Sequence, residues 1–464
     1  MQTDTLAPVS RPLGDAVVST AYWQSCSASG HRLWKWIAWA FAAYWIFFVA
    51  GAFLKHKQLN EVGAVIVLAT LGWASLERLW IRIDSVALAC LALAFLPVIQ
   101  AVGSNVPKSP DSIIKHVSLC LVMALSRVLR LPVISQSKVR RLLAFQVLII
   151  LFISLTLCRG ATWDGERYSG MFANPNNLAL IPLLLLLLVD QLRDSWLIQA
   201  SAHAVVILVL AFTTTSGAVV AYALGCIIYL ISKLSRRTQA IAWSLCLAAS
   251  LVGGVAFFTI DESALPDMRL TKQLFLMRSK MGKVLQGGDI QYYQFEKVEG
   301  SGTGSALWRI QHWRDTLIAY SDGTVAEQVF GFGPGSSVSV TKILPHNEYL
   351  RMLFEEGLVG LALFLFAWYG IIRAAPSGIR YVAITVAIYS FSENNLDNFP
   401  FMALLVLCLS ANNTDAWIVA PIHKVRDRFL ARRTSSSSSL QINQGGLTAA
   451  RFEVERELTR PQVA

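Results

Sequence analysis

The chain has 464 residues, of which 55% are hydrophobic and only 15% are charged. Soluble domains carry about a quarter charged residues, so this composition excludes an ordinary soluble protein and indicates a polytopic helical membrane protein. The net charge of +11 is also typical of proteins that bind nucleic acid, but no basic cluster lies in a soluble domain. We therefore assign the positive charge to cytoplasmic loops and expect no nucleic-acid partner.

A membrane-spanning helix needs about 20 apolar residues. The first apolar run starts at Leu33 and is long enough to span, so we expect it to remain as a helix and not to be cleaved as a signal peptide. The sequence predicts an all-α fold with about twelve transmembrane helices, and the candidates at 177–190 and 379–392 are short. The candidate spans are 33–54, 62–77, 85–102, 112–130, 142–158, 177–190, 195–213, 216–232, 240–260, 347–372, 379–392 and 400–420.

The distribution of Lys and Arg predicts the orientation of these spans. With a cytoplasmic N-terminus, the even-numbered connections and the C-terminal segment hold most of the basic residues, for example at 127–141, 233–237 and 424–433. Basic residues gather on the cytoplasmic side of membrane proteins. We therefore expect both termini in the cytoplasm and the loop 261–345 on the periplasmic side.

These segments predict the organisation of the whole chain. Thr434 begins a stretch with five consecutive serines and few aromatic residues, which is typical of disorder. The expected parts are a cytoplasmic segment 1–32, nine transmembrane helices in 33–260, a large periplasmic loop 261–345, three transmembrane helices in 346–420, and a basic, Ser-rich cytoplasmic tail 421–464.

The stretch LPHNEYLRMLFEEGLVG at 344–360 places charge at the start of an apolar segment, where charge is costly and seldom kept without a role. His346 precedes Asn347 at a predicted helix start on the outer side. An imidazole titrates near neutral pH and suits a general base. The alternative is an interfacial histidine that only caps the helix.

The same stretch contains two further patterns. Arg351 and Glu355 are four residues apart, so they can pair along one helix face and support it, and a purely structural role is the alternative to a functional one. Gly357 and Gly360 would allow another helix to approach closely.

A second stretch, GERYSGMFANPNN at 165–177, lies on the predicted outer side. Arg167 is one of few basic residues in the short outer connections, and a guanidinium binds phosphate in a fork geometry. A solvated loop charge is the alternative. Asn174 and Asn176 fit a turn and the cap of the next helix.

A third stretch spans 307–335 and begins with a predicted short helix. Arg309 and Trp313 share one face of this helix, and Arg314 lies beside them. The GFGPG segment that follows predicts a tight turn. Because it has no Lys-Ser/Thr after it and no alternating strands and helices around it, we do not interpret it as a nucleotide site.

Missing motifs narrow the chemistry. The sequence contains no DxD, GxSxG or HExxH motif, and the seven cysteines have no metal-ligand or disulfide spacing. We therefore expect no metal and no cofactor. Arginines and one histidine on the outer side suit a diphosphate-bearing donor and a hydroxyl acceptor. The alternative is a transporter or flippase, although transporters tend to show paired repeats and ionisable groups near the midplane.

The motifs together resemble a known family. His346, Asn347, Leu350, Glu355, Gly357 and Gly360 match H-N-x-x-L-x-x-x-x-E-x-G-x-x-G, which is similar to the signature of the bacterial O-antigen ligase and polysaccharide polymerase superfamily. The segment RYSGMFANPNNLA at 167–179 is similar to that family's R-x-x-G-x-F-x-N-P-N-x-L-A. Arg309 and Trp313, followed by two glycines of GFGPG, are similar to a third element. The resemblance covers roughly 60–420.

The resemblance implies a metal-independent glycosyltransferase of the inner membrane, with its active site on the periplasmic face. Such an enzyme takes a glycan from undecaprenyl diphosphate and moves it to an acceptor hydroxyl in the synthesis of lipopolysaccharide or exopolysaccharide. The acceptor is a second glycan or lipid A–core, and polysaccharide export machinery is a further expected partner. The roles implied are acceptor activation by His346, diphosphate binding by Arg167, Arg309 and Arg314, and support by Asn176, Trp313, Asn347 and Glu355.

One position departs from the family pattern. The family often has an S-x-S-R-like element at the start of a helix, and here Thr215 and Ser216 are followed by Gly217 where an arginine would be expected. This departure removes one auxiliary phosphate contact. Arg314 is our candidate to compensate for it.

Overall fold

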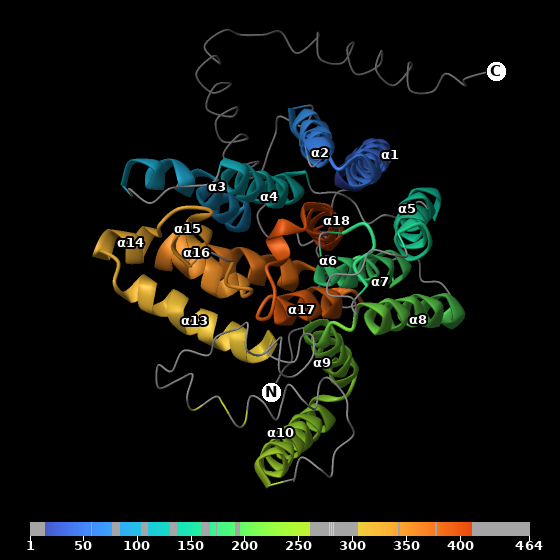
Figure 1. The fold of residues 1–464 in the computed structure, drawn as a ribbon. Helices are drawn as coiled ribbons and strands as arrows, with labels where there is room; N and C mark the ends of the chain where they lie inside the picture. The colour runs from blue at the N-terminus through green and yellow to red at the C-terminus, as the bar shows by residue number, and fades with distance from the viewer. Residues whose placement is uncertain are drawn as a thin grey trace, which may run out of the picture. The chain divides into compact units, whose positions relative to one another are not determined.

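The computed structural model describes residues 14–56, 58–76, 84–103, 110–129, 137–158, 168–172, 174–190, 195–259, 278, 280, 282, 305–341, 344–375 and 378–410. Within these ranges every regular element is a helix (Figure 1). The helices are α1 (Gly14–Leu54), α2 (Gln58–Leu76), α3 (Ser85–Gly103), α4 (Pro110–Val128), α5 (Ser137–Thr156), α6 (Pro175–Leu180), α7 (Leu183–Asp190), α8 (Trp196–Thr213), α9 (Ser216–Ser232), α10 (Arg236–Thr259), α13 (Ser305–Ser321), α14 (Val325–Phe330), α15 (Ser336–Thr341), α16 (Glu348–Ala374), α17 (Arg380–Tyr389), η2 (Asn395–Asp397) and α18 (Phe399–Ser410).

The apolar segments predicted to span the membrane are helical over their described residues, which confirms the all-α expectation for this part of the chain. Four of the described helices are both long and apolar enough to cross a bilayer: Arg32–Leu54, Lys138–Thr156, Trp196–Thr213 and Glu348–Ala374. The chain is therefore a multi-pass membrane protein. The number twelve stays a prediction, and so do the predicted domain boundaries. The tail 421–464 lies outside the described residues.

Two short helices are apolar on every side and lie inside the bundle. Every residue of α18 is buried, and so is the run of leucines that forms most of α7. A helix that is apolar all round has no polar face to turn to water, so it is stable where other helices surround it. α18 packs against α4, α7 and α16, and α7 packs against α5 and α8.

The functional stretches surround α16. This helix packs against α3, and α13, α14 and α15 contact it as well (Figure 1). Residues 305–341 of the predicted outer loop form three helices that pack on α16. α17 packs along α9 and also contacts α16.

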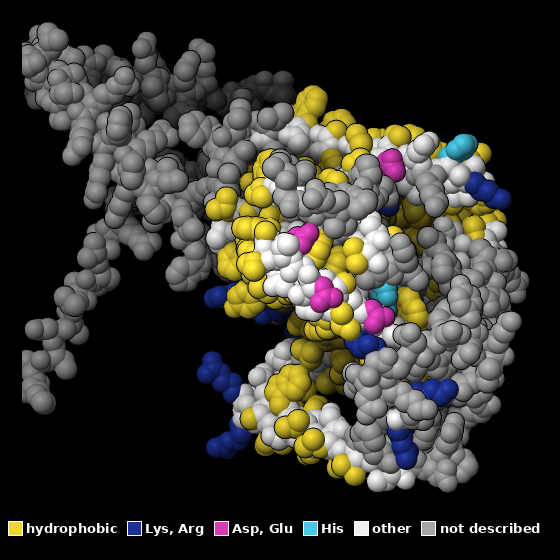
Figure 2. All heavy atoms as spheres, turned by 60° about the vertical axis from the view of Figure 1, so that its left-hand side comes forward, with side chains coloured by type: hydrophobic (Ala, Val, Ile, Leu, Met, Phe, Trp, Pro, Cys, Tyr) yellow, Lys and Arg dark blue, Asp and Glu magenta, His cyan; other side chains and the backbone are white. Residues whose placement is uncertain are grey.

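Apolar side chains also cover much of the outside. α8 and α10 expose large side chains such as Trp196, Ile207, Leu245 and Val252, which are between 59% and 73% exposed. Figure 2 shows a face on which hydrophobic side chains predominate and charged side chains are few. Such contiguous apolar surface is the expected surface for helices in contact with lipid.

Candidate active site

α16 begins at Glu348, two residues after His346. Asn347 is its N-cap, and the Asn347 side chain accepts a hydrogen bond of 3.1 Å from the backbone N–H of Leu350. This cap satisfies one of the backbone donors that a helix N-terminus leaves free. Asn347 therefore caps the helix, and its supporting role in the site stays a prediction.

The backbone of His346 is unusual. Its φ angle is +51°, in the left-handed region that non-glycine residues seldom adopt and that costs about 1–2 kcal/mol. Two contacts hold the chain on either side: Trp313 Nε1 donates to Pro345 O at 2.7 Å, and Glu348 N donates to Ser390 O at 2.8 Å. Strained residues of this kind persist where the surroundings hold them, and they concentrate at functional sites.

The His346 ring contacts Glu393, a residue that the sequence analysis did not identify. His346 Nδ1 lies 3.0 Å from Glu393 Oε1. The Glu393 side chain is only 4% exposed, whereas that of His346 is 24% exposed. The carboxylate is therefore enclosed, and the imidazole is partly exposed.

Two predicted site residues meet at the same carboxylate. Asn176 Nδ2 donates a hydrogen bond to Glu393 Oε2, and Arg309 Nη2 lies 3.7 Å from that oxygen. Asn176 lies on α6, Arg309 lies on α13 and Glu393 lies between α17 and α18. Three segments that are distant in the sequence thus converge beside His346.

Glu393 is held in its ionised form. Burial alone would raise the pKa of this carboxyl, but the hydrogen bond with His346 and the attraction of His346 and Arg309 outweigh it and lower the pKa. The buried carboxylate is thus negatively charged at neutral pH, next to the candidate base.

An aromatic pair lines the other side of the imidazole. Trp308 meets the His346 ring in an edge arrangement with ring centroids 5.4 Å apart. The same tryptophan stacks on His312 at 5.2 Å with the rings nearly parallel. Because His312 is buried, the pair forms a firm wall beside His346.

The predicted arginines have different positions. Arg309 reaches the site, and Trp313, one turn later on α13, faces the same way. Arg314 follows Arg309 by five positions, a rotation of about 140° around the helix, and it pairs with Asp315 at 3.9 Å. Arg167 lies outside the described residues, so its role stays a prediction.

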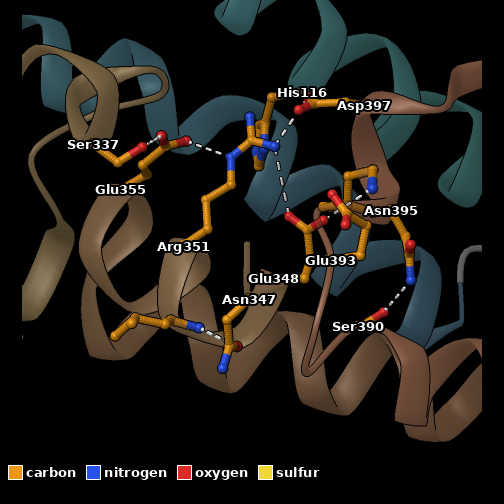
Figure 3. A network of polar contacts seen from close by, with 12 residues as sticks. His116, Ser337, Asn347, Glu348, Arg351, Glu355, Ser390, Glu393, Asn395 and Asp397 are labelled. Carbon is orange, nitrogen blue, oxygen red and sulfur yellow. Dashed lines mark hydrogen bonds and ion pairs between the residues drawn. The ribbon is translucent and has the colours of Figure 1, made fainter. Parts of the chain in front are cut away.

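Glu355 belongs to a separate buried network centred on Arg351 (Figure 3). Arg351 Nε lies 3.0 Å from Glu355 Oε2, and its Nη1 lies 3.0 Å from Asp397 Oδ1 and 3.7 Å from Glu348 Oε1. The pairing of Arg351 with Glu355 is thus confirmed. A buried ion pair of this kind specifies geometry more than it adds stability. Here it ties α16 to the 390–398 connection that carries Glu393.

Gly357 permits the close helix contact that its spacing predicted, because a Cβ atom there would lie 2.4 Å from Val329 O of α14. Gly357 also breaks α16, with φ +69° and ψ −171°, a conformation that only glycine adopts readily. The break frees two backbone carbonyls, and the GFGPG segment satisfies them. Phe332 N donates to Phe354 O at 3.1 Å, and Gly333 N donates to Glu355 O at 2.8 Å. The GFGPG segment thus supplies the hydrogen-bond donors that α16 lacks at its break.

Gly217 explains the departure from the family pattern. A Cβ atom at this position would lie 2.5 Å from Ser392 Oγ. Ser392 adjoins Glu393, so a side chain as large as arginine would displace the segment that carries the carboxylate. The close packing of α9 against this segment therefore favours a small residue at this position. Whether Arg314 compensates stays a prediction.

No group of three or more His, Cys, Asp or Glu side chains with metal-binding geometry occurs in the described part of the chain. The acidic residues around α16 are engaged with Arg351, Gln100 and Ser337. The residues around His346 offer hydrogen bonds and positive charge, which suit proton transfer and anion binding.

Comparison with protein families agrees with this geometry. Residues 201–365 match the family described as O-Antigen ligase. This segment belongs to the O-antigen ligase-like superfamily. It contains His346, Asn347, Arg309, Trp313 and Glu355, and the resemblance stated from the motifs is confirmed. No curated protein matches the chain.

The match indicates the general role of the matched family. Members of the O-antigen ligase family are ligases and polymerases of glycosyltransferase type, which act in the biosynthesis of cell-surface polysaccharide. Asn176 and Glu393 lie outside the matched segment. In the structure Asn176 contacts Glu393, and Glu393 contacts His346 of the matched segment.

Glu393 could have been suspected from its sequence context. It stands in FSENNLDNFP, a polar interruption between two apolar segments, and an acidic residue at such a place is costly without a partner. The partner itself was not visible, because 47 positions separate Glu393 from His346.

Proposed function

We propose that the protein transfers a glycan from undecaprenyl diphosphate to an acceptor hydroxyl on the periplasmic face of the inner membrane. The observation that carries the proposal is that His346 and Arg309, which both lie in the segment that matches the O-antigen ligase family, contact one buried carboxylate. A candidate base and a candidate diphosphate ligand are thus placed a few ångströms apart.

The proposed reaction is a single displacement. The acceptor oxygen attacks the anomeric carbon of the donor sugar, and the bond from that carbon to the diphosphate oxygen breaks. His346 Nε2 takes the proton of the acceptor hydroxyl. Arg309 meets the negative charge that grows on the diphosphate, and fixed positive charge at that position lowers the barrier. Arg167 and Arg314 are proposed as further diphosphate ligands.

The acceptor class decides between a polymerase and a ligase. The test is reconstitution of the purified protein in liposomes with one defined undecaprenyl-diphosphate-linked repeat, first alone and then with lipid A–core. A ladder from the donor alone identifies a polymerase, and product only after lipid A–core is added identifies a ligase. Movement of the donor across the bilayer without a new glycosidic bond would instead identify a transporter.

The role of Arg309 in diphosphate binding can be tested without knowing which sugar the donor carries. Undecaprenyl diphosphate without a glycan is the probe, and its binding to the protein in nanodiscs is measured. The Arg309→Ala variant should bind it about 10-fold or more weakly, because a charge-assisted contact contributes about 1.5–3 kcal/mol. Arg373→Ala, at the far, exposed end of α16, is the matched control and should bind as the wild type does.

The base is tested with His346→Asn. Asparagine tolerates the left-handed backbone that His346 adopts, so the variant should fold. It should bind undecaprenyl diphosphate normally and lose transfer by about 100-fold or more, the range expected for a general base. Full transfer activity in His346→Asn would contradict the base role.

A further inference from the structure

We propose that Glu393 is a positioning residue that holds the His346 imidazole in one orientation and one tautomer, with the proton on Nδ1 and the lone pair on Nε2. The inference deepens the proposed function and rests on it for its catalytic meaning. It names a residue outside the O-antigen ligase match.

The chemistry of the contact fixes the tautomer. A carboxylate can only accept a hydrogen bond, and Glu393 Oε1 lies 3.0 Å from His346 Nδ1. Nδ1 must therefore carry the hydrogen. A neutral imidazole has one N–H, so Nε2 is left with its lone pair free to take a proton from the acceptor. The depressed pKa of Glu393 keeps the carboxylate in the form that this contact needs.

Glu393 is itself held in place. Its second oxygen accepts the hydrogen bond from Asn176, and Arg309 lies 3.7 Å away. The connection around it is anchored at both ends. Ser390 O accepts from the backbone of Glu348, and Asp397 pairs with Arg351 (Figure 3). A rigid support of this kind restricts the ring to a productive geometry.

The arrangement also serves the reaction after proton transfer. When Nε2 takes the proton, the ring becomes an imidazolium that faces a buried negative charge, and an orienting carboxylate stabilises such a cation. Because Arg309 shares this carboxylate, the base and the diphosphate ligand are fixed relative to each other.

The test is the protonation pattern of the His346 ring. The full chain, labelled with ¹⁵N-histidine, is studied by NMR in lipid at pH 8, and His346→Asn identifies the resonance among those of seven histidines. The wild type should carry its proton on Nδ1. In Glu393→Gln the amide N–H can donate to Nδ1, so the proton should move to Nε2. Glu393→Asp, which keeps the charge, should restore the wild-type pattern at least in part.

The matched control is Asp397→Asn. Asp397 lies on the same connection but contacts Arg351, so its loss tests general loosening of the segment. This variant should keep the proton of His346 on Nδ1. A proton on Nε2 in the wild type, or the same pattern in the wild type and Glu393→Gln, would overturn the inference.

Transfer assays separate this inference from the proposed function. Glu393→Gln should lower kcat by about 100-fold or more, as replacement of an orienting carboxylate by its amide does beside other catalytic imidazoles, with a smaller rise in donor KM because Arg309 shares this carboxylate. If His346→Asn is inactive and Glu393→Gln is fully active, the positioning role fails and the proposed function stands. If the tautomer follows Glu393 but His346→Asn is active, the base role fails and the positioning stands.

Discussion

At the scale of single residues, His346 combines a costly backbone conformation with a partly exposed imidazole. The cost of about 1–2 kcal/mol is a sizeable fraction of a protein's net stability, so neighbouring contacts must offset it. The contacts that do so come from Trp313, Ser390 and Glu393. We therefore expect Trp313 to support the site through its indole N–H, which holds the carbonyl of Pro345 directly before His346.

Glu393 should make the folded chain less stable as the pH falls into the acid range. Its pKa is lower in the folded chain than the ordinary value of 4.5, so its contribution to stability is fully present above that value and is lost as pH falls through the folded pKa. Thermal unfolding in detergent between about pH 8 and about pH 3 should therefore show Glu393→Gln less stable at neutral pH. The two curves should converge in acid. Parallel curves over the whole range would contradict the assignment.

At the scale of elements, the broken helix α16 is the organising feature. Its first part carries Arg351 and Glu355, and its second part runs apolar to Ala374. Backbone groups freed by a break in a membrane helix must find partners within the protein. GFGPG and the side chain of Gln100 supply them, since Gln100 Nε2 also donates to Glu355 O at 2.9 Å.

Replacement of Gly357 by alanine should damage this junction. The added Cβ would lie 2.4 Å from Gly331 N and from Val329 O, at a backbone conformation that alanine avoids. We expect a loss of about 3 kcal/mol or more in unfolding free energy, measured by thermal or denaturant unfolding in detergent. Gly72→Ala is the control. Gly72 lies on α2, where a Cβ meets nothing within 4 Å, so this change should be neutral or slightly stabilising. Equal effects of the two changes would refute the role of the break.

At the scale of the whole molecule, the site contains residues from several connections between predicted spans. The distribution of Lys and Arg predicts that all of these connections lie on the periplasmic side. Asn176, His346 and Glu393 belong to odd-numbered connections in the predicted topology, and the first two both contact Glu393. This agreement supports the proposed periplasmic site.

Cysteine labelling tests the predicted orientation. In a chain with its seven cysteines replaced, Asp322→Cys lies in the exposed turn between α13 and α14, and Ser235→Cys lies in the exposed turn between α9 and α10. An impermeant maleimide added to intact inner-membrane vesicles of right-side-out orientation should label the first and not the second. Both should react after permeabilisation. The reverse pattern would place the active site in the cytoplasm.

Much of the fold was determined by the sequence alone, because it depends on local patterns. Long apolar runs satisfy their backbone groups as helices, so the positions of α2 to α5 and of α8 to α10 follow from composition and length. The predicted span 177–190 is instead divided into the two short helices α6 and α7. The cap at Asn347 and the pairing of Arg351 with Glu355 follow from spacing within one helix. The family resemblance followed from the same short motifs.

Only the tertiary structure decided which distant residues form the site. Glu393 lies 47 positions from His346 and 217 from Asn176, and no spacing rule relates residues on separate helices. The same is true of Gly357, whose role depends on a loop that reaches it from before α16. Periodicity fixes which residues share a face of one helix, but the packing of helices fixes which faces meet. The role of a buried carboxylate such as Glu393 therefore depends on the residues that the packing of helices places next to it.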